Sequence, residues 1–172
     1  MARQIWLLRH AEAEPHGARE DAERRLTPRG EQQARAAGVA LEQLGAGFDA
    51  VLYSPKVRAR ATAELAAEGW PAEERDLLAE HPPLASGFDA SGALAALDAA
   101  PDRAGREGGR RVLLVGHEPD LSSVIAGLCG GNVGLKKGGL AIVRLDGARG
   151  ELAAVLRPSE IALIAGAPVG RH

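Results

Sequence analysis

Short apolar runs that stop abruptly at polar residues predict the strands of this chain. Residues 5–8 run directly into Arg9 and His10, and residues 112–115 run into Gly116 and His117. Runs that are apolar throughout are typical of strands buried on both faces, as in a parallel sheet. Two further runs, residues 140–145 and 152–156, flank a glycine-containing turn, which predicts a hairpin. The expected strands are residues 5–8, 48–53, 77–78, 112–115, 140–145 and 152–156.

Helix start signals fall between these strands. Thr27 precedes Pro28, an arrangement typical of an N-cap followed by the first helical position. Apolar residues at 34, 37, 41 and 44 then form one buried helical stripe. Ser54 and Pro55 repeat the start signal and predict a helix to about residue 67. Further helices are expected at residues 91–100 and 120–128, a glycine-rich connector at 105–111 and a frayed tail from about residue 166.

The alternation of strands and helices predicts the fold class. We expect a three-layer α/β/α sandwich with a mostly parallel central sheet. The length of 172 residues fits one domain, so residues 1–172 are interpreted as a single domain. In such folds, ligands bind where strands end and helices begin.

Composition and charge exclude several classes of protein. The net charge of −2 and an aromatic content of 3% argue against sequence-independent binding of nucleic acid. Cys129 is the single cysteine, which excludes an internal disulfide and a cysteine-based zinc site. The first apolar run is too short for a signal-peptide core or a membrane span. We therefore expect a cytoplasmic protein that does not interact with a membrane.

Three strand ends carry residues with chemical potential. They are Arg9-His10, the segment from Ser54 to Arg58, and His117. Taken one at a time, each has an ordinary interpretation: a surface arginine with a capping histidine, a solvated basic helix face, and a buried histidine satisfied by the backbone. Taken together, parallel neighbouring strands would bring all of them to the carboxyl edge of the sheet. A phosphoryl group would relieve the repulsion between two guanidiniums and two imidazoles, because arginine forks match its oxygens.

Four motifs occur in a fixed order along almost the whole chain. They are Arg9-His10, Leu26-Thr27-Pro28-Arg29-Gly30, Ser54-Pro55 with Arg58-Ala59 and Thr62, and Gly116-His117. In these motifs the sequence resembles the histidine phosphatase (phosphoglycerate mutase-like) superfamily. Its small size, Gly116-His117-Glu118-Pro119 and Lys136-Lys137-Gly138-Gly139 resemble the SixA-type phosphohistidine phosphatases. Ala11 departs from the glycine that usually follows the Arg-His pair, and a negative φ at Ala11 would accommodate the extra methyl group.

The resemblance implies a phosphatase that needs no metal or other cofactor. His10 would attack phosphorus and form a phosphohistidine, while Arg9, Arg58 and His117 would bind the phosphoryl oxygens. Glu80 stands where larger members of the superfamily carry a general acid, and it is either a substrate-binding acid or a loop carboxylate. His16 and His81 would line the mouth of the pocket or remain surface histidines.

The substrate implied by the resemblance is a phosphorylated signalling protein of the histidine-phosphotransfer type. A compact insert around residues 73–87 would leave the cleft open, which suits a phosphorylated side chain on a protein. The alternatives are a small-molecule phosphomonoesterase of the same superfamily and a phosphate-binding signalling module with little turnover. A cysteine phosphatase is excluded because Leu135 stands where its arginine would follow Cys129. Lys136 and Lys137 are either solvated or in contact with a phosphoprotein partner.

Overall fold

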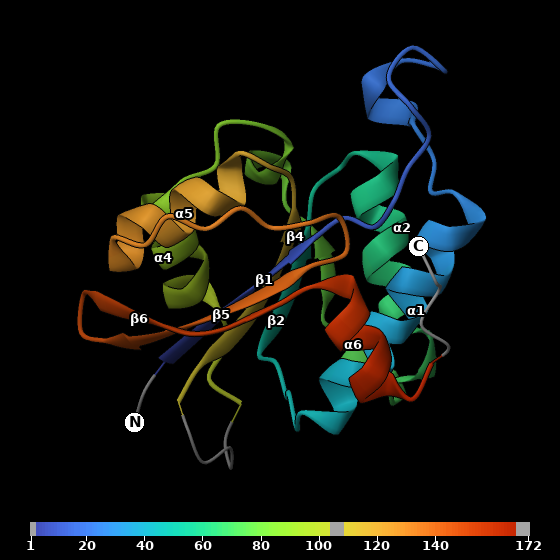
Figure 1. The fold of residues 1–172 in the computed structure, drawn as a ribbon. Helices are drawn as coiled ribbons and strands as arrows, with labels where there is room; N and C mark the ends of the chain where they lie inside the picture. The colour runs from blue at the N-terminus through green and yellow to red at the C-terminus, as the bar shows by residue number, and fades with distance from the viewer. Residues whose placement is uncertain (1–2, 104–108, 168–172) are drawn as a thin grey trace.

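A six-stranded sheet forms the middle layer of the molecule. The structure is a computed structural model that describes residues 3–103 and 109–167, and Figure 1 shows their arrangement. The strand order is β3-β2-β4-β1-β5-β6. Each predicted strand is present, although the second and third begin later than expected and the sixth begins earlier. The strands are β1 (Arg3–Arg9), β2 (Ala50–Tyr53), β3 (Leu78–Glu80), β4 (Arg111–Gly116), β5 (Leu140–Asp146) and β6 (Arg149–Leu156).

The four neighbouring strands β3, β2, β4 and β1 run parallel, so their carboxyl ends share one edge of the sheet. β5 pairs antiparallel with β1, and β6 pairs antiparallel with β5. The expectation of a mostly parallel sheet that ends in a hairpin is therefore confirmed. Gly147 has a φ of 61° in the hairpin turn, a left-handed conformation that favours glycine.

Helices cover both faces of the sheet, which confirms the three-layer prediction. α4 and α5 lie on one face, and α1, α2 and α6 lie on the other (Figure 1). None of the helices within the described ranges combines the length and apolar character needed to cross a membrane. The α-helices are α1 (Pro28–Gln43), α2 (Val57–Ala66), α3 (Ala72–Arg75), α4 (Ala90–Ala99), α5 (Asp120–Cys129) and α6 (Pro158–Ala165). Single 3-10 turns are η1 (Asp21–Glu23), η2 (Ala67–Gly69) and η3 (Pro82–Ala85).

Alternating side chains of the central strands feed two cores. Ile5 and Leu7 of β1 pack towards α4 and α5, while Trp6 and Leu8 pack towards α1, α2 and α6. Side chains alternate between the faces of a strand, so a strand covered on both faces must be apolar at every position. The uninterrupted apolar runs that marked β1 and β4 in the sequence have this cause.

Local sequence signals predicted some helix boundaries and not others. Thr27 caps α1 as predicted, because its Oγ1 accepts a hydrogen bond from Gly30 N at 3.0 Å. α6 was not predicted, although Pro158 occupies its first turn and Gly166 ends it in a left-handed conformation. Its apolar pattern is too short to be distinguished from a loop by periodicity. Residues 105–108 of the expected connector and 168–172 of the expected frayed tail lie outside the described residues.

Candidate active site

The three strand ends singled out in the sequence meet at the carboxyl edge of the sheet. Arg9, the last residue of β1, is the register partner of Gly116 at the end of β4. His10 N donates to Gly116 O at 3.0 Å, and Ser54 N donates to Val115 O at 3.0 Å. The rings of His10 and His117 consequently lie with their centroids 5.2 Å apart. The structure thus brings the expected histidines together in one buried site.

Hydrogen bonding determines which nitrogen of His10 carries the proton. Nδ1 lies 2.8 Å from Ala11 O, and a carbonyl oxygen only accepts, so Nδ1 is the protonated nitrogen. Nε2 of the neutral ring therefore carries the lone pair. Arg58 Nε donates to this Nε2 at 3.3 Å. Burial, followed by the nearby positive charges, lowers the pKa of His10 to about 3, so the ring is neutral at pH 7.

The turn after His10 accommodates Ala11 without strain. No non-glycine residue in the described ranges has a positive φ, so Ala11 meets the condition for replacing glycine. Its methyl group is fully buried, and its backbone N–H donates to Thr62 Oγ1 at 3.0 Å. The Thr62 hydroxyl in turn donates to Arg58 O at 2.7 Å. These bonds attach the turn after His10 to α2, the helix that carries Arg58.

Arg58 reaches the site from the first turn of α2 and is 4% exposed. Its Nη1 donates to Asp21 O at 2.7 Å, and its Nη2 lies 3.4 Å from Asp21 Oδ2. Lys56 Nζ donates to the same carboxylate at 3.0 Å, and Arg24 Nη2 donates to it at 3.0 Å. The Lys56 ammonium makes the largest contribution to a lowered Asp21 pKa. Asp21 is therefore a counter-ion for three cations at the edge of the site.

Sequence reasoning missed Asp21, Arg24 and Lys56. Asp21 and Arg24 lie around η1, a single turn in a polar loop that offers no periodic pattern. Lys56 was assigned only to a basic segment. These three residues come together only because the loop folds back onto Arg58. This is a tertiary contact, and no local sequence pattern predicts it.

His117 is oriented by a serine. Its Nε2 lies 2.7 Å from Ser54 Oγ, and its Nδ1 is buried without a hydrogen-bond partner among the described residues. Ser54 Oγ also accepts from Lys56 N at 3.3 Å, which leaves its hydroxyl proton for His117 Nε2. In that arrangement Nδ1 of His117 carries a proton and can donate to an oxyanion. Burial and then the Arg58 charge lower the pKa of His117 to about 3.

The prediction that Ser54 caps α2 is wrong. The helix begins at Val57, its N-cap is Lys56, and no side chain caps it. The Ser54 hydroxyl is used by His117 instead, so a residue with a helix-start signature serves the site.

Arg9 is fixed by the loop that precedes β5. Its Nη1 donates to Leu135 O at 2.8 Å, and its backbone N–H donates to Gly139 O at 3.0 Å. Gly138 N donates to His10 O at 2.9 Å. The Nε atom of Arg9 is buried and has no partner within the described residues. Arg9 Nε and His117 Nδ1 are thus two buried nitrogens that an oxyanion would satisfy.

Glu80 lies apart from this hydrogen-bond network. It ends β3 beside Tyr53 of β2 and is exposed, and its side chain makes no hydrogen bond or ion pair with any of the described residues. Its charge contributes to a raised pKa of Arg60, a smaller effect than that of Glu64. Arg60 points away from the site and donates to Glu64 at 2.7 Å. This position favours the interpretation of Glu80 as a loop carboxylate.

The two remaining histidines differ from the buried pair. The His16 side chain is 88% exposed and lies 3.9 Å from an Asp21 carboxylate oxygen. His81 is half-buried against Phe88, with the ring centroids 5.9 Å apart. Neither makes a hydrogen bond with His10 or His117 in the part of the chain that the structure describes.

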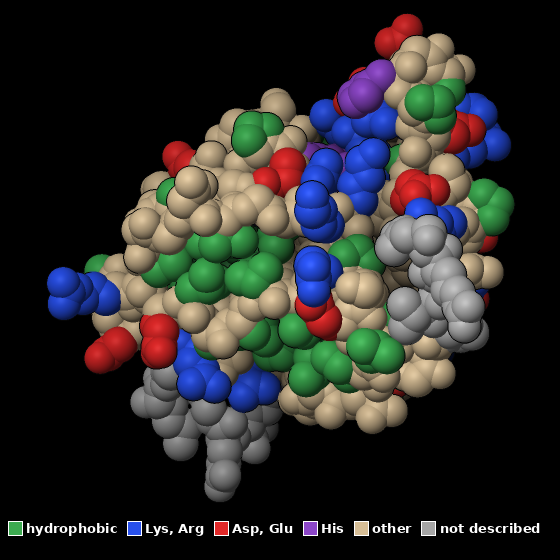
Figure 2. Space-filling view, in the orientation of Figure 1, with side chains coloured by type: hydrophobic (Ala, Val, Ile, Leu, Met, Phe, Trp, Pro, Cys, Tyr) green, Lys and Arg blue, Asp and Glu red, His purple; other side chains and the backbone are tan. Residues whose placement is uncertain are grey.

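Positive charge gathers around the site. Figure 2 shows Lys and Arg side chains in the upper half of this face, beside the loop that precedes α1. No group of three or more histidine, cysteine, aspartate or glutamate side chains in residues 3–103 and 109–167 is arranged to hold a metal ion. A neutral imidazole whose Nε2 carries a lone pair, surrounded by guanidinium and imidazole donors, suits a tetrahedral oxyanion and nucleophilic attack on its central atom.

Several known proteins are similar to this chain in sequence or in fold. The family model for the histidine phosphatase superfamily (branch 1) matches residues 5–82. An uncharacterized protein of Picosynechococcus sp. is 34% identical over 158 residues, which cover 85% of this chain and 87% of that protein. The structure of the protein histidine phosphatase SixA complexed with tungstate is 26% identical with a TM-score of 0.76, covering 92% of this chain and 99% of that one. Phosphoglycerate mutase from Bacillus anthracis has a TM-score of 0.71 at 17% identity, covering 95% of this chain and 96% of that one.

The fold and the site define a phosphatase with the phosphoglycerate mutase-like α/β architecture. The chain belongs to the histidine phosphatase superfamily.

Proposed function

We propose that this protein is a metal-independent phosphohistidine phosphatase that works through a phosphohistidine intermediate on His10. The observation that carries the proposal is the tautomer of His10. Its Nδ1–H is bound to Ala11 O, and its Nε2 lone pair faces Arg58. A neutral nucleophile of fixed orientation, with cationic donors around it, meets the requirements for in-line phosphoryl transfer.

In the first step, His10 Nε2 attacks phosphorus while the bond from phosphorus to the substrate nitrogen breaks. Arg58 transfers its Nε hydrogen bond from the lone pair to a phosphoryl oxygen, which frees the nucleophile. Arg9 and His117 donate to the other equatorial oxygens. The substrate imidazole keeps the electron pair of the broken bond and leaves as a neutral ring when its second nitrogen carries a proton.

In the second step, water attacks the phosphohistidine. The bond from His10 Nε2 to phosphorus breaks and its electron pair returns to Nε2. Both protons of the attacking water remain on oxygens of the released phosphate. Throughout both steps Nδ1–H stays bound to Ala11 O, so the ring does not rotate away.

The leaving group distinguishes phosphohistidine from phosphate esters. An alkoxide needs a proton from a general acid, whereas a neutral imidazole leaves without one. Glu80 is exposed and forms no bond with His10, Arg58 or His117 in the described structure. The lack of an acid held against the nucleophile supports the phosphohistidine substrate.

The shape of the site supports a protein-borne substrate. The segment between β3 and α4 is compact, because residues 81–89 contain only the four-residue turn η3. A phosphorylated histidine on the surface of a signalling protein, of the histidine-phosphotransfer type, is the substrate that we propose. The SixA neighbour is described as a protein histidine phosphatase, in agreement with this proposal.

The test compares two substrates in the presence of a metal chelator. Phosphate release is measured from a phosphorylated histidine-phosphotransfer domain and from p-nitrophenyl phosphate. We expect a kcat/KM at least about tenfold higher for the phosphohistidine domain. Preference for the ester would favour a small-molecule phosphomonoesterase, and binding without turnover of either would favour a phosphate-binding signalling module.

A further inference from the structure

Lys136 and Lys137 are presented at the rim of the site by a tight turn. Gly139 N donates to Lys136 O at 2.7 Å, and Gly138 has a φ of 76°, which favours glycine. A Cβ atom at position 139 would lie 2.8 Å from Lys136 O, so this glycine is also needed. Because Gly138 N is bound to His10 O, the lysine pair has a fixed position relative to the nucleophile.

Both lysine side chains are exposed, and neither forms an ion pair with any carboxylate in the described ranges. The Asp21 carboxylate at the edge of the site already binds Lys56, Arg58 and Arg24. Two positive charges therefore remain available to a partner. They are additional to the buried guanidiniums that face the phosphoryl oxygens.

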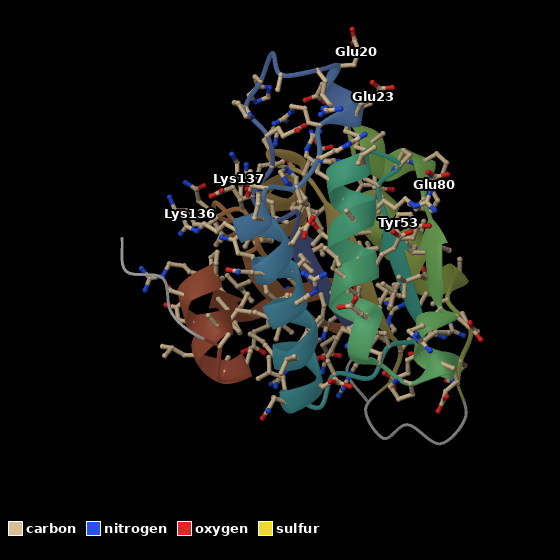
Figure 3. All side chains as sticks on the ribbon, turned by 90° about the vertical axis from the view of Figure 1, so that its right-hand side faces the viewer. Glu20, Glu23, Tyr53, Glu80, Lys136 and Lys137 are labelled. Carbon is tan, nitrogen blue, oxygen red and sulfur yellow. The ribbon has the colours of Figure 1, made fainter. Side chains whose placement is uncertain are left out.

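Three carboxylates without ion-pair partners lie on the other sides of the rim. Glu20 and Glu23 lie at η1, and Glu80 ends β3; all three are exposed and lack an ion-pair partner within the described part of the chain. Figure 3 shows Lys136 and Lys137 on one side of the upper end of the molecule and Glu80 on the other, with Glu20 and Glu23 above. An acidic segment beside the reacting phosphate is attracted to the lysine side and repelled by these three carboxylates.

We propose that the Lys136-Lys137 pair is a docking site for carboxylates that flank the phosphorylated residue of a protein substrate. This inference rests on the proposed phosphohistidine phosphatase function and adds the charge of the partner surface. A nucleic acid does not fit the same rim, because Glu20, Glu23 and Glu80 would repel a continuous phosphate backbone. The occupant is therefore a protein segment with acidic residues on one side of its phosphohistidine.

The docking site acts on association and not on the chemical step. Exposed ion pairs contribute little individually, but two fixed unpaired charges steer an oppositely charged partner. We expect KM to change by about fivefold and kcat to stay the same. The effect should shrink as ionic strength rises, since exposed charges are screened over about 8 Å in physiological salt.

The experiment uses synthetic phosphohistidine peptides that differ only in two flanking residues, which are Glu, Gln or Lys. The flank is placed before the phosphohistidine in one set and after it in another. Wild type should show a KM about fivefold lower for a Glu-flanked peptide than for its Gln-flanked counterpart. Lys136→Gln/Lys137→Gln should remove the difference, and Lys136→Glu/Lys137→Glu should invert it in favour of the Lys-flanked peptide.

A matched control removes two positive charges elsewhere. Arg144 and Arg149 are exposed on β5 and β6, and Arg144 is the register partner of Gln4 at the amino end of β1, far from the site. Arg144→Gln/Arg149→Gln should keep the preference for the Glu-flanked peptide. Its loss in this variant would mean that net charge, and not the lysine pair, determines the preference, which would overturn the docking site.

The outcomes separate the two proposals. Turnover of all peptides with equal KM, in wild type and in the lysine variants, would overturn the docking site and leave the proposed function intact. No phosphate release from any peptide by wild type would overturn both. An inverted preference in the Glu variant supports both, because a merely structural role of the lysines would not exchange one flank for the other.

Discussion

At the scale of single residues, the site depends on one arginine that faces inward and one that does not. Arg58 contacts His10 and Asp21, whereas Arg60 is exposed and bound to Glu64. Two residues of separation turn a helical side chain to a different face. The interpretation of α2 as a helix with a solvated basic face therefore applies to Arg60 and not to Arg58.

Arg58→Ala should weaken vanadate binding by at least about tenfold, because a charge-assisted bond contributes about 1.5–3 kcal/mol. Arg60→Ala should change it by less than about twofold. Isothermal titration of both variants with vanadate makes the comparison. Equal effects in the two variants would show that the phosphate is bound through a different face of α2.

Asp21→Asn should tighten binding of inorganic phosphate by about fivefold. The carboxylate bonds to Lys56 and Arg58 and repels an arriving anion, whereas an amide retains a hydrogen-bonding oxygen without the charge. The backbone carbonyl that accepts from Arg58 is unchanged. Weaker phosphate binding in the variant would instead assign the carboxylate to aligning Arg58, and a thermal unfolding scan would exclude a loss of fold.

The sequence identified the site residues that follow strands at the carboxyl edge of the sheet. It did not identify the site residues that lie in the loop before α1. His10, Arg58 and His117 follow short apolar runs, and parallel pairing brings such positions together without further information. Asp21 reaches the site only because a loop folds over α2. The orienting role of Ser54 was hidden because a serine before a proline also signals a helix start.

At the scale of elements, α1 and α2 pack so closely that the backbone of one helix approaches the backbone of the other at Gly38. A Cβ atom at Gly38 would lie 1.8 Å from Ala66 O, a distance that requires the two helices to separate. The stripe of small and apolar residues predicted α1, but not this close approach. Periodicity identifies the face of a helix that is buried and does not give the distance to its neighbour.

Gly38→Ala should lower the free energy of unfolding by at least about 2 kcal/mol, as overpacking of rigid backbone usually does. Gly69 is the matched control, because a Cβ atom there has nothing within 4 Å. Gly69→Ala should change stability by less than about 0.5 kcal/mol. Urea unfolding of both variants measures the difference; a wild-type midpoint for Gly38→Ala would contradict the packing of α1 on α2.

At the scale of the whole molecule, the two buried histidines make the stability of the fold depend on pH. His10 and His117 are 4% and 6% exposed, and burial lowers the pKa of each to about 3. In the unfolded chain each returns towards about 6.5. Between these values the unfolded chain binds more protons than the folded protein, so the folded state loses stability as pH falls.

The free energy of unfolding should therefore decrease as pH is lowered from about 6.5 to 5, by up to about 2.7 kcal/mol per pH unit for two histidines. Denaturant unfolding at half-unit pH steps measures the slope. A His10→Gln/His117→Gln variant should show a clearly smaller slope in the same window. An unchanged slope in that variant would mean that other groups cause the pH dependence.

The proposed mechanism depends on a covalent bond between phosphorus and His10 Nε2. Rapid acid-free quenching of the enzyme with a phosphohistidine substrate, followed by mass spectrometry and ³¹P NMR at alkaline pH, detects such a bond and distinguishes the two ring nitrogens. We predict one phosphoryl group on His10, attached at Nε2, that disappears in His10→Ala together with turnover. A phosphoryl group on His117, attachment at Nδ1, or full turnover by His10→Ala would contradict the mechanism.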